Sequence, residues 1–491
     1  MNKHQTDFSW SDLELMHQAT LDILSTAGVE FPSQTTREVF RRHGFRIEGD
    51  KVFISQAQLE AALGSAPAAF IIRARNPGNN LKLGKGDFVL APTPGATQIA
   101  DRHGRLRLAG LADYENLAKL VQTSAINMVM SHQVCCPQDI KTETAHLDMF
   151  WRDITLTDRV LTANTSSTAL VEDFLKILEI VFGGSESVES GPCSINVINP
   201  CTPLKYAADQ SESLMLLSAR NQPVAVTNMM MLGATAPISV PGALVLGNAE
   251  ILAGLVLTQL VRPGAPAIYG STSCPMDMKT MVAVLGAPET LWLSRGALAL
   301  ADYYHLPCRT GGSLTDAHRP DAQALLDGTL CFQNALSNGA AYVLHSFGMM
   351  SSYLAVGLEK FVLDEEMAAL VLASLKMPEV SEQSIGADLI KSLGSKGDYL
   401  THPSTIKGFR RLFRSKFLNR AGYEQWRAAG GLDIAEAAAD EVEKRLAQWE
   451  KPALDHEVEK NLANFIDARK DKLGRPKPHL PANSAGKGGA S

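Results

Sequence analysis

The feature that most constrains the fold is a regular alternation of short apolar runs with helix-length segments. The runs are rich in β-branched residues, as strands are, and lie at 126–132, 159–164, 194–199, 223–228, 266–270, 307–312, 340–345 and 360–364. Most precede a segment long enough for a helix, such as 172–182, 206–220, 242–261, 289–304 and 321–337. Eight strands alternating with helices over about 250 residues predict an α/β fold, a (β/α)8 TIM-type barrel.

An open, doubly wound sheet is the alternative for such an alternation. In that fold a G-x-G-x-x-G turn after the first strand binds the phosphates of a dinucleotide. No such turn follows the run at 126–132. The sequence therefore favours the barrel.

The segments outside the alternation predict three further parts of the chain. Residues 1–120 mix helical repeats with strand and turn patterns, so we expect an N-terminal α+β cap before a barrel at 121–378. Amphipathic segments after the barrel predict a C-terminal helical extension at 379–470. The last stretch, 471–491, is rich in Lys, Pro, Gly and Ser, which predicts a disordered tail.

Charge and hydropathy exclude several classes of partner. Lys and Arg total 46 against 52 Asp and Glu, a net charge of −6, so no basic excess favours a nucleic acid. The chain starts with polar residues, and no stretch holds the ~18 uninterrupted apolar residues of a membrane helix. We expect a cytoplasmic protein that binds neither nucleic acid nor membrane.

The cysteines bear on metal binding. There are seven, with no C-x-x-C pair, which is typical of reduced thiols. Cys135 and Cys136 lie close to His132 and could begin a zinc site, but no further ligands follow at a recognisable spacing. We favour buried or inert thiols and predict no resident metal.

Polar residues end most of the predicted strands. The last non-glycine residues of the eight runs are His132, Asn164, Asn199, Asn228, Tyr269, Thr310, His345 and Asp364. In a barrel they would share the carboxyl-end face, where active sites are built. Asn is also a common strand-terminating residue, and His345 could be a buried histidine bonded to a backbone carbonyl.

Two groups of residues near these ends suggest ligand contacts. Gly311 and Gly312 lack Cβ atoms and let a small molecule approach their amides closely, although an ordinary turn before a helix is the alternative. Methionine and aromatic side chains gather after the fourth, fifth and seventh runs. Such side chains could hold an alkylammonium cation, with ordinary core packing as the alternative.

Several segments, in order, resemble the trimethylamine methyltransferase family of corrinoid-dependent methyltransferases. They lie at 20–29, 269–279, 311–318 and 399–403. The resemblance implies a (β/α)8 barrel that passes a methyl group from a methylated amine to the Co(I) centre of a separate corrinoid protein. It also implies that no cofactor is bound permanently, because the corrinoid belongs to the partner.

The chain departs from the founding members in one respect. Those enzymes carry pyrrolysine, which would fall near Leu314, whereas every position here is a standard amino acid. Members without pyrrolysine include glycine betaine methyltransferases, so the resemblance implies a quaternary amine substrate, glycine betaine, with dimethylglycine as product. Proline betaine or carnitine as substrate, a non-catalytic betaine-binding protein and a metal-dependent lyase on the same barrel are the alternatives.

For a betaine, the sequence suggests separate sites for the two charges. The amides of Gly312 and Ser313, with His345, would bind the carboxylate. Tyr269 and Phe347 would hold the cation, and Asn228 would also contact the substrate. Catalytic residues are not assigned. The segment 399–409 is a candidate contact with the corrinoid protein, and we expect a homo-oligomer.

Overall fold

The computed structural model of the protein describes residues 8–474. Its centre is a six-stranded parallel sheet in the order β11-β12-β14-β17-β18-β6. The strands are β6 (Val89–Leu90), β11 (Asn196–Ile198), β12 (Val224–Asn228), β14 (Ala267–Ser271), β17 (Cys308–Gly311) and β18 (Tyr342–Leu344). This sheet forms a parallel half-barrel, which confirms the predicted α/β class.

A second parallel pair lies beside both outer strands of this sheet. It consists of β9 (Val129–Met130) and β10 (Val160–Leu161). A bridge joins Leu161 of β10 to Ser194, just before β11. On the other side the Met128 amide donates to the Leu90 carbonyl of β6, at 3.0 Å.

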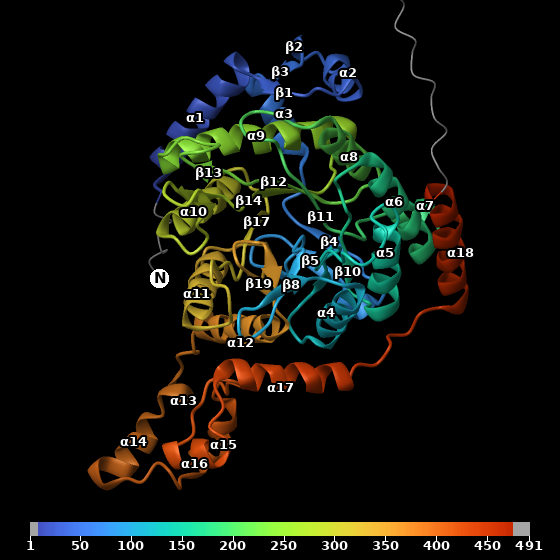
Figure 1. Ribbon diagram of the computed structural model, residues 1–491. Coiled ribbons are helices and arrows are strands. Elements are labelled where there is room, and N and C mark those ends of the chain that lie inside the picture. Colours follow the sequence, from blue (N-terminus) through green and yellow to red (C-terminus); the bar gives the residue numbers. More distant parts are fainter. Residues whose placement is uncertain (1–7, 475–491) are drawn as a thin grey trace, which may run out of the picture.

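A helix follows each of the eight parallel strands along the chain. In order they are α4 (Leu111–Thr123), α5 (Ala145–Leu156), α6 (Thr168–Phe182), α8 (Ala208–Ala219), α9 (Val240–Val261), α10 (Pro288–Tyr303), α11 (Ala322–Ser337) and α12 (Leu358–Leu375). A short helix, α7 (Ser185–Glu189), follows α6. Figure 1 shows these helices surrounding the central strands.

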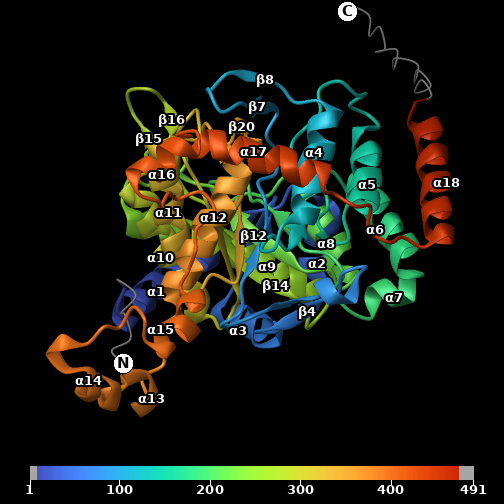
Figure 2. The same ribbon diagram turned by 90° about the horizontal axis from the view of Figure 1, so that it is seen from below.

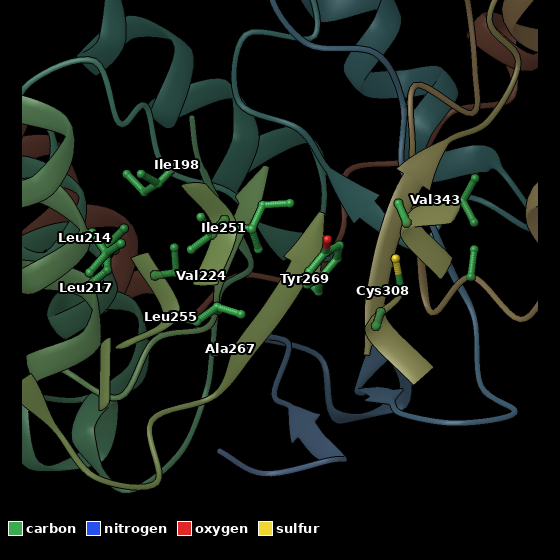
Figure 3. Packing of buried hydrophobic residues seen from close by; sticks show 14 of the residues in the cluster. Ile198, Leu214, Leu217, Val224, Ile251, Leu255, Ala267, Tyr269, Cys308 and Val343 are labelled. Carbon is green, nitrogen blue, oxygen red and sulfur yellow. The ribbon is translucent and has the colours of Figure 1, made fainter. Parts of the chain in front are cut away.

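Alternating side chains of the strands enter two different cores. Val224, Tyr269 and Cys308 belong to the large cluster that packs against the helices, together with Leu255 of α9 (Figure 3). Val226 belongs to the same cluster. The intervening positions form a separate cluster on the other face of the strands. That cluster includes Val89, Val129, Val160, Ile195, Ala225, Ile268, Tyr342 and Leu344. Such a period of two is expected for strands whose two faces are both covered.

The eighth predicted strand, 360–364, is wrong, because these residues lie inside α12. The strand that pairs with β18 is instead β6, from the segment predicted as the cap. Lys360 and Asp364 are four residues apart, so the helix places them on one face, where both are wholly buried and form an ion pair. Lys360 Nζ also donates to Ser313 Oγ at 2.7 Å. The division into cap, barrel and extension stays a prediction.

The N-terminal segment and the loops add small sheets, whose strand pairs are antiparallel except for two. The first sheet, with α1 (Trp10–Thr26), α2 (Gln34–Arg42) and α3 (Gln56–Ser65), contains β1 (Val29–Glu30), β2 (Arg46–Glu48) and β3 (Lys51–Phe53). A hairpin follows, formed by β4 (Phe70–Ile72) and β5 (Leu81–Leu83). A four-stranded sheet contains β7 (Gln98–Ala100), β8 (Leu106–Leu108), β19 (Met349–Met350) and β20 (Ala355–Val356). The last sheet contains β13 (Met231–Leu232), β15 (Cys274–Asp277) and β16 (Val282–Ala283). The two parallel pairs are β13–β15 and β7–β20. Helices α1, α2 and α3 pack against α9.

The C-terminal segment is helical. Four short helices, α13 (Glu382–Ile385), α14 (Ala387–Leu393), α15 (Pro403–Gly408) and α16 (Tyr423–Ala428), form an arm that projects from the body (Figure 1). Then α17 (Ile434–Ala447) packs on α12 and α4 (Figure 2), and α18 (His456–Leu473) packs on α5 and α6. Most of the predicted tail, 475–491, lies outside the described residues.

Within residues 8–474, α9 is the one helix that is long and apolar enough to cross a membrane by length and composition. Its apolar window is 72% buried inside the molecule. Helices of the N-terminal segment cover one side, and β12 and β14 lie on another. That environment is typical of the central helix of a folded core.

The buried pair of Lys360 and Asp364 gives a test of the fold. Burial raises the pKa of the Asp364 carboxyl to about 6, against the opposing effect of Lys360. Lys360→Ala would leave this carboxylate buried without its cation, so we expect the free energy of unfolding to fall by about 3–5 kcal/mol in chemical denaturation. Lys391→Ala, in an exposed pair with Asp388, is the control and should change it by less than about 1 kcal/mol. An unchanged unfolding midpoint for Lys360→Ala would contradict the pairing.

Candidate functional site

A cavity of about 580 Å³ opens where the eight parallel strands end. Every strand or the turn after it contributes to the lining: Pro94 and Gly95 after β6, Ser131 and His132 after β9, Thr162 to Ser166 after β10, Val197 and Asn199 of β11 and its turn, Met229 after β12, Thr272 after β14, Arg309 in β17, and Leu344 and His345 at the end of β18. Carboxyl ends of parallel strands are where ligands usually bind in α/β proteins.

The most unusual residue of the lining is Arg309. Its side chain is 2% exposed, and its neighbour in register on β18 is Tyr342. Nε and Nη1 of Arg309 are buried without a hydrogen-bond partner, and so is the Tyr342 hydroxyl. None of the described residues that line the cavity is Asp or Glu. A buried guanidinium without a counter-charge is costly, so this cavity is suited to an anionic group.

His345 and Tyr353 lie on the same side of the cavity as Arg309. The two rings meet edge to face with 4.8 Å between centroids, and His345 Nδ1 lies 2.9 Å from Thr93 Oγ1. Burial, with Arg309 nearby, holds the pKa of His345 well below its usual value, so the imidazole is neutral. The buried Tyr353 hydroxyl has no partner, and burial raises its pKa, so it remains a donor.

Several residues that line this cavity have strained backbone conformations. Four lining residues other than glycine have φ in the left-handed region: Gln133 at 65°, His345 at 58°, Ser352 at 51° and Tyr353 at 74°. Such conformations are unfavourable for residues with a Cβ, and they persist where surrounding structure imposes them, often at functional sites.

A second polar group lies at the end of β9. His132 Nδ1 is 2.9 Å from Asp153 Oδ2, and the Tyr114 hydroxyl donates to Asp153 Oδ1 at 2.5 Å. The His132 ring stacks on Phe150 with 3.8 Å between centroids. Its Nε2 is buried without a hydrogen-bond partner, and its side chain is wholly buried. Burial raises the pKa of the Asp153 carboxyl, while His132 and Tyr114 act against this.

The predicted role of the glycine turn does not fit this arrangement. The Gly312 amide donates to the Leu344 carbonyl at 2.8 Å, and the Ser313 amide donates to the His345 carbonyl at 2.9 Å. Neither amide is therefore free for a carboxylate. Gly312 is required for close approach instead, because a Cβ there would lie 2.7 Å from Ser346 Oγ. The Ser313 hydroxyl donates to Asp364 at 2.5 Å.

Three other predicted site residues face away from the cavity. The Tyr269 hydroxyl donates to Asn248 of α9 at 3.1 Å, and Phe347 packs on Phe361. Asn228 accepts a hydrogen bond from Ser273 at 3.2 Å. Among the described residues that line the cavity, Tyr269, Phe347 and Asn228 are not found, whereas His345 is.

Some of the other polar residues predicted at strand ends line the cavity, and others do not. His132, Asn164 and Asn199 line the cavity, and Thr310 and Asp364 do not. Arg309 was not predicted as a site residue, although the sequence held a signal: an arginine inside a short, wholly buried strand is rare unless it has a partner or a function.

The described residues offer little for a metal ion. All seven cysteines are free, and within residues 8–474 no group of three His, Cys, Asp or Glu side chains is placed to hold a metal. Cys135 is buried, which raises the pKa of its thiol, and Cys136 is partly buried. The described lining of the cavity consists of uncharged residues, two histidines and one guanidinium.

Comparison with known proteins identifies the family. Relatives with similar sequences match along nearly their whole length. The chain is 35% identical over 463 residues to a glycine betaine methyltransferase of Desulfitobacterium hafniense, covering 94% of this chain and 96% of the relative. It is 29% identical over 479 residues to a trimethylamine methyltransferase of the same species, covering 95% and 94%, and 30% identical over 472 residues to a proline betaine:corrinoid methyltransferase of Eubacterium limosum, covering 93% and 96%.

Solved structures support the same fold. The hydroxylamine complex of MtmB has a TM-score of 0.54 and 11% identity, over 92% of this chain and 90% of that one. The monomethylamine methyltransferase MtmB of Methanosarcina barkeri has a TM-score of 0.50, also at 11% identity. The family model described as trimethylamine methyltransferase (MTTB) matches residues 4–474. This match over nearly the whole chain shows that the protein belongs to the trimethylamine methyltransferase family.

Proposed function

We propose that this protein transfers a methyl group from a quaternary amine that carries a carboxylate, glycine betaine, to the Co(I) centre of a separate corrinoid protein. Dimethylglycine is the second product. The observation that carries the proposal is the unpaired Arg309 guanidinium in a cavity whose described lining lacks acidic residues. Trimethylamine and other simple amines have no group that could balance this charge, whereas a betaine has a carboxylate.

In this proposal the carboxylate binds at the wall formed by β17 and β18. Arg309 supplies the charge, and the hydroxyls of Tyr342 and Tyr353 are donors that have no partner in the protein. His345, held by Thr93, completes this end of the cavity. This site replaces the glycine-turn amides. A charge-assisted hydrogen bond of this kind is worth about 1.5–3 kcal/mol.

The methyl transfer requires an oriented substrate more than it requires a general acid or base. When a methyl leaves the quaternary nitrogen, the electrons of the broken C–N bond stay on nitrogen, which becomes a neutral tertiary amine. The corrinoid of the partner protein would supply the nucleophile that accepts the methyl. The chain fixes the carboxylate, aligns one methyl with the cavity mouth and excludes water.

The eight parallel strands, in this proposal, close into a complete (β/α)8 barrel with the cavity at its carboxyl-end face. The bridge from Leu161 to Ser194 and the hydrogen bond from Met128 to Leu90 support the closure. We also propose that the protein is cytoplasmic, a location that its seven free cysteines support. The predicted homo-oligomer stays a prediction.

A spectroscopic assay tests the function directly. Purified protein, cob(I)alamin and glycine betaine should give methylated cobalamin, followed by its absorption, and an equal amount of dimethylglycine. Proline betaine and carnitine in the same assay test the alternative substrates. Binding of betaine without any methylation would support the non-catalytic betaine-binding protein instead.

Arg309→Met should raise the KM for glycine betaine by about 10- to 100-fold, because the lost contact is worth about 1.5–3 kcal/mol at ~1.4 kcal/mol per decade. Initial rates of cobalamin methylation measure the effect. Arg309→Lys keeps the positive charge but loses the forked arrangement of donors, so its KM should lie between those of the parent protein and Arg309→Met. Because the substitution removes an unpaired buried charge, the melting temperature should not fall. An unchanged KM in Arg309→Met would remove Arg309 from the site.

The arm gives a second test, concerning the partner protein. Tyr399, Leu400 and Phe409 are exposed apolar side chains within the predicted contact segment 399–409. If the corrinoid protein docks there, the double change Tyr399→Ala and Leu400→Ala should raise the KM for that protein by about fivefold or more, with unchanged rates on free cobalamin. Leu15→Ala, exposed on α1, is the control. Equal loss with both acceptors would show a folding role.

A further inference from the structure

Three consecutive residues in the turn between β19 and β20 have left-handed backbone conformations. The φ angles are 51° for Ser351, 51° for Ser352 and 74° for Tyr353. None of the three is glycine, and L-residues with a Cβ visit this region as single residues rather than in runs. Ser352 and Tyr353 line the cavity and are partly exposed. This left-handed turn therefore shapes the wall of the site, and contacts from outside it must hold it in place.

Hydrogen bonds hold the left-handed turn against the loop that follows β17. The Ser351 amide donates to the Ala317 carbonyl at 2.9 Å, and the Ser352 amide donates to the Thr315 carbonyl at 3.3 Å. In addition, His318 Nδ1 lies 2.9 Å from Ser351 Oγ. The loop after β17 is therefore the support on which the turn rests.

Asp316, in the same loop, ties the turn to a third segment. Its Oδ1 accepts a hydrogen bond from the Ser352 hydroxyl at 2.7 Å and one from the Leu285 amide at 3.0 Å. Its Oδ2 accepts from the Leu285 amide at 2.9 Å and from the Gly286 amide at 3.0 Å. One carboxylate thus joins the segments that precede α10, α11 and α12, all at the carboxyl-end face of the strands.

The left-handed turn determines where Tyr353 lies. The Tyr353 ring meets His345 edge to face, with 4.8 Å between centroids, and its buried hydroxyl has no hydrogen-bond partner among the described residues. A change of φ to the ordinary right-handed region would redirect the Cα–Cβ bond of Tyr353 and move the ring away from His345. The position of this ring therefore depends on the turn, and through the turn on Asp316.

We propose that Asp316 is a positioning residue of the substrate site, which holds the left-handed turn so that Tyr353 and His345 form the wall that binds the carboxylate. This inference rests on the proposed function. Asp316 is not among the described residues that line the cavity, so it acts through Tyr353 and not by contact with the substrate. Binding of ligands that have a carboxylate should depend on Asp316, and binding of ligands without one should not.

Three ligands separate this role from a general loss of stability. Glycine betaine has a carboxylate and a cation, 3,3-dimethylbutyrate keeps the carboxylate with carbon in place of nitrogen, and tetramethylammonium keeps only the cation. Dissociation constants are measured by calorimetry on the full-length protein, without cobalamin, so that binding is separated from methyl transfer.

Asp316→Ala should weaken both carboxylates by about three- to tenfold, which is ~0.7–1.4 kcal/mol at ~1.4 kcal/mol per decade. It should leave tetramethylammonium within about twofold of the parent protein. Asp277→Ala is the matched control, because Asp277 accepts from the Lys279 and Thr280 amides in the neighbouring hairpin in the same way, at 2.7 and 3.1 Å. It should change the binding of none of the three ligands.

Two further variants separate positioning from charge. Asp316→Asn can turn its carbonyl oxygen to the Leu285 and Gly286 amides and its amide group to the Ser352 hydroxyl, which accepts as well as donates. Its affinity for betaine should therefore stay within about twofold of the parent. In a Tyr353→Phe background, Asp316→Ala should cost less than about twofold, because two changes that act through one contact are not additive.

Unchanged binding of betaine by Asp316→Ala, or equal weakening of betaine and tetramethylammonium, would overturn the positioning role. So would a loss in Asp316→Asn as large as in Asp316→Ala, or the full loss in the Tyr353→Phe background. If Asp316→Ala does not fold, Ser352→Ala, which removes one hydrogen bond of the carboxylate, decides by the same pattern. A parent protein that binds betaine with this pattern but never methylates cobalamin would overturn the proposed function and leave the positioning role standing. A parent that does not bind betaine would overturn both.

Discussion

The structure depends on the alternation of side chains along short, buried parallel strands. Successive residues of a strand point to opposite faces, so each strand sends one set of side chains toward the helices and the other away from them. Val224 and Val226 pack with the helices, while Ala225 between them joins the opposite cluster. This parity decides which polar residue at a strand end meets the cavity and which meets a helix.

The same alternation of side chains explains why Arg309 can be buried and still face the cavity. Cys308 belongs to the helix-facing core, so the next residue faces the other way, beside Tyr342 on β18. The other seven parallel strands place apolar or aromatic side chains on that inner face, and β17 contributes a guanidinium instead. A charge left unpaired in such a place lowers stability, and its retention is understandable where a ligand supplies the missing charge.

Much of the fold was predictable from the sequence, because alternation of strands and helices is a strong local signal. Seven of the eight runs contain strands of the structure. The eighth failed because Lys360 and Asp364 suit one helical face as well as a strand end, and β6 was too short to recognise. The site was harder to predict, because the last residue of a strand can face either side of the sheet. Tyr269 was therefore predicted although it faces the helices, and Arg309 was not predicted although it faces the cavity.

The remaining part of the site depends on tertiary structure that no local pattern encodes. The Gly312 and Ser313 amides looked free in the sequence, yet β18 uses both as ladder donors. Conversely, the side chains that gather at the cavity are presented by strained turns, with His345 and Tyr353 in left-handed conformations. That strain is sustained by the surrounding packing, and it directs hydroxyl and imidazole groups to one wall before any ligand arrives. A preorganised wall loses little entropy on binding, so even a small zwitterion can be held in a single orientation with one methyl toward the acceptor.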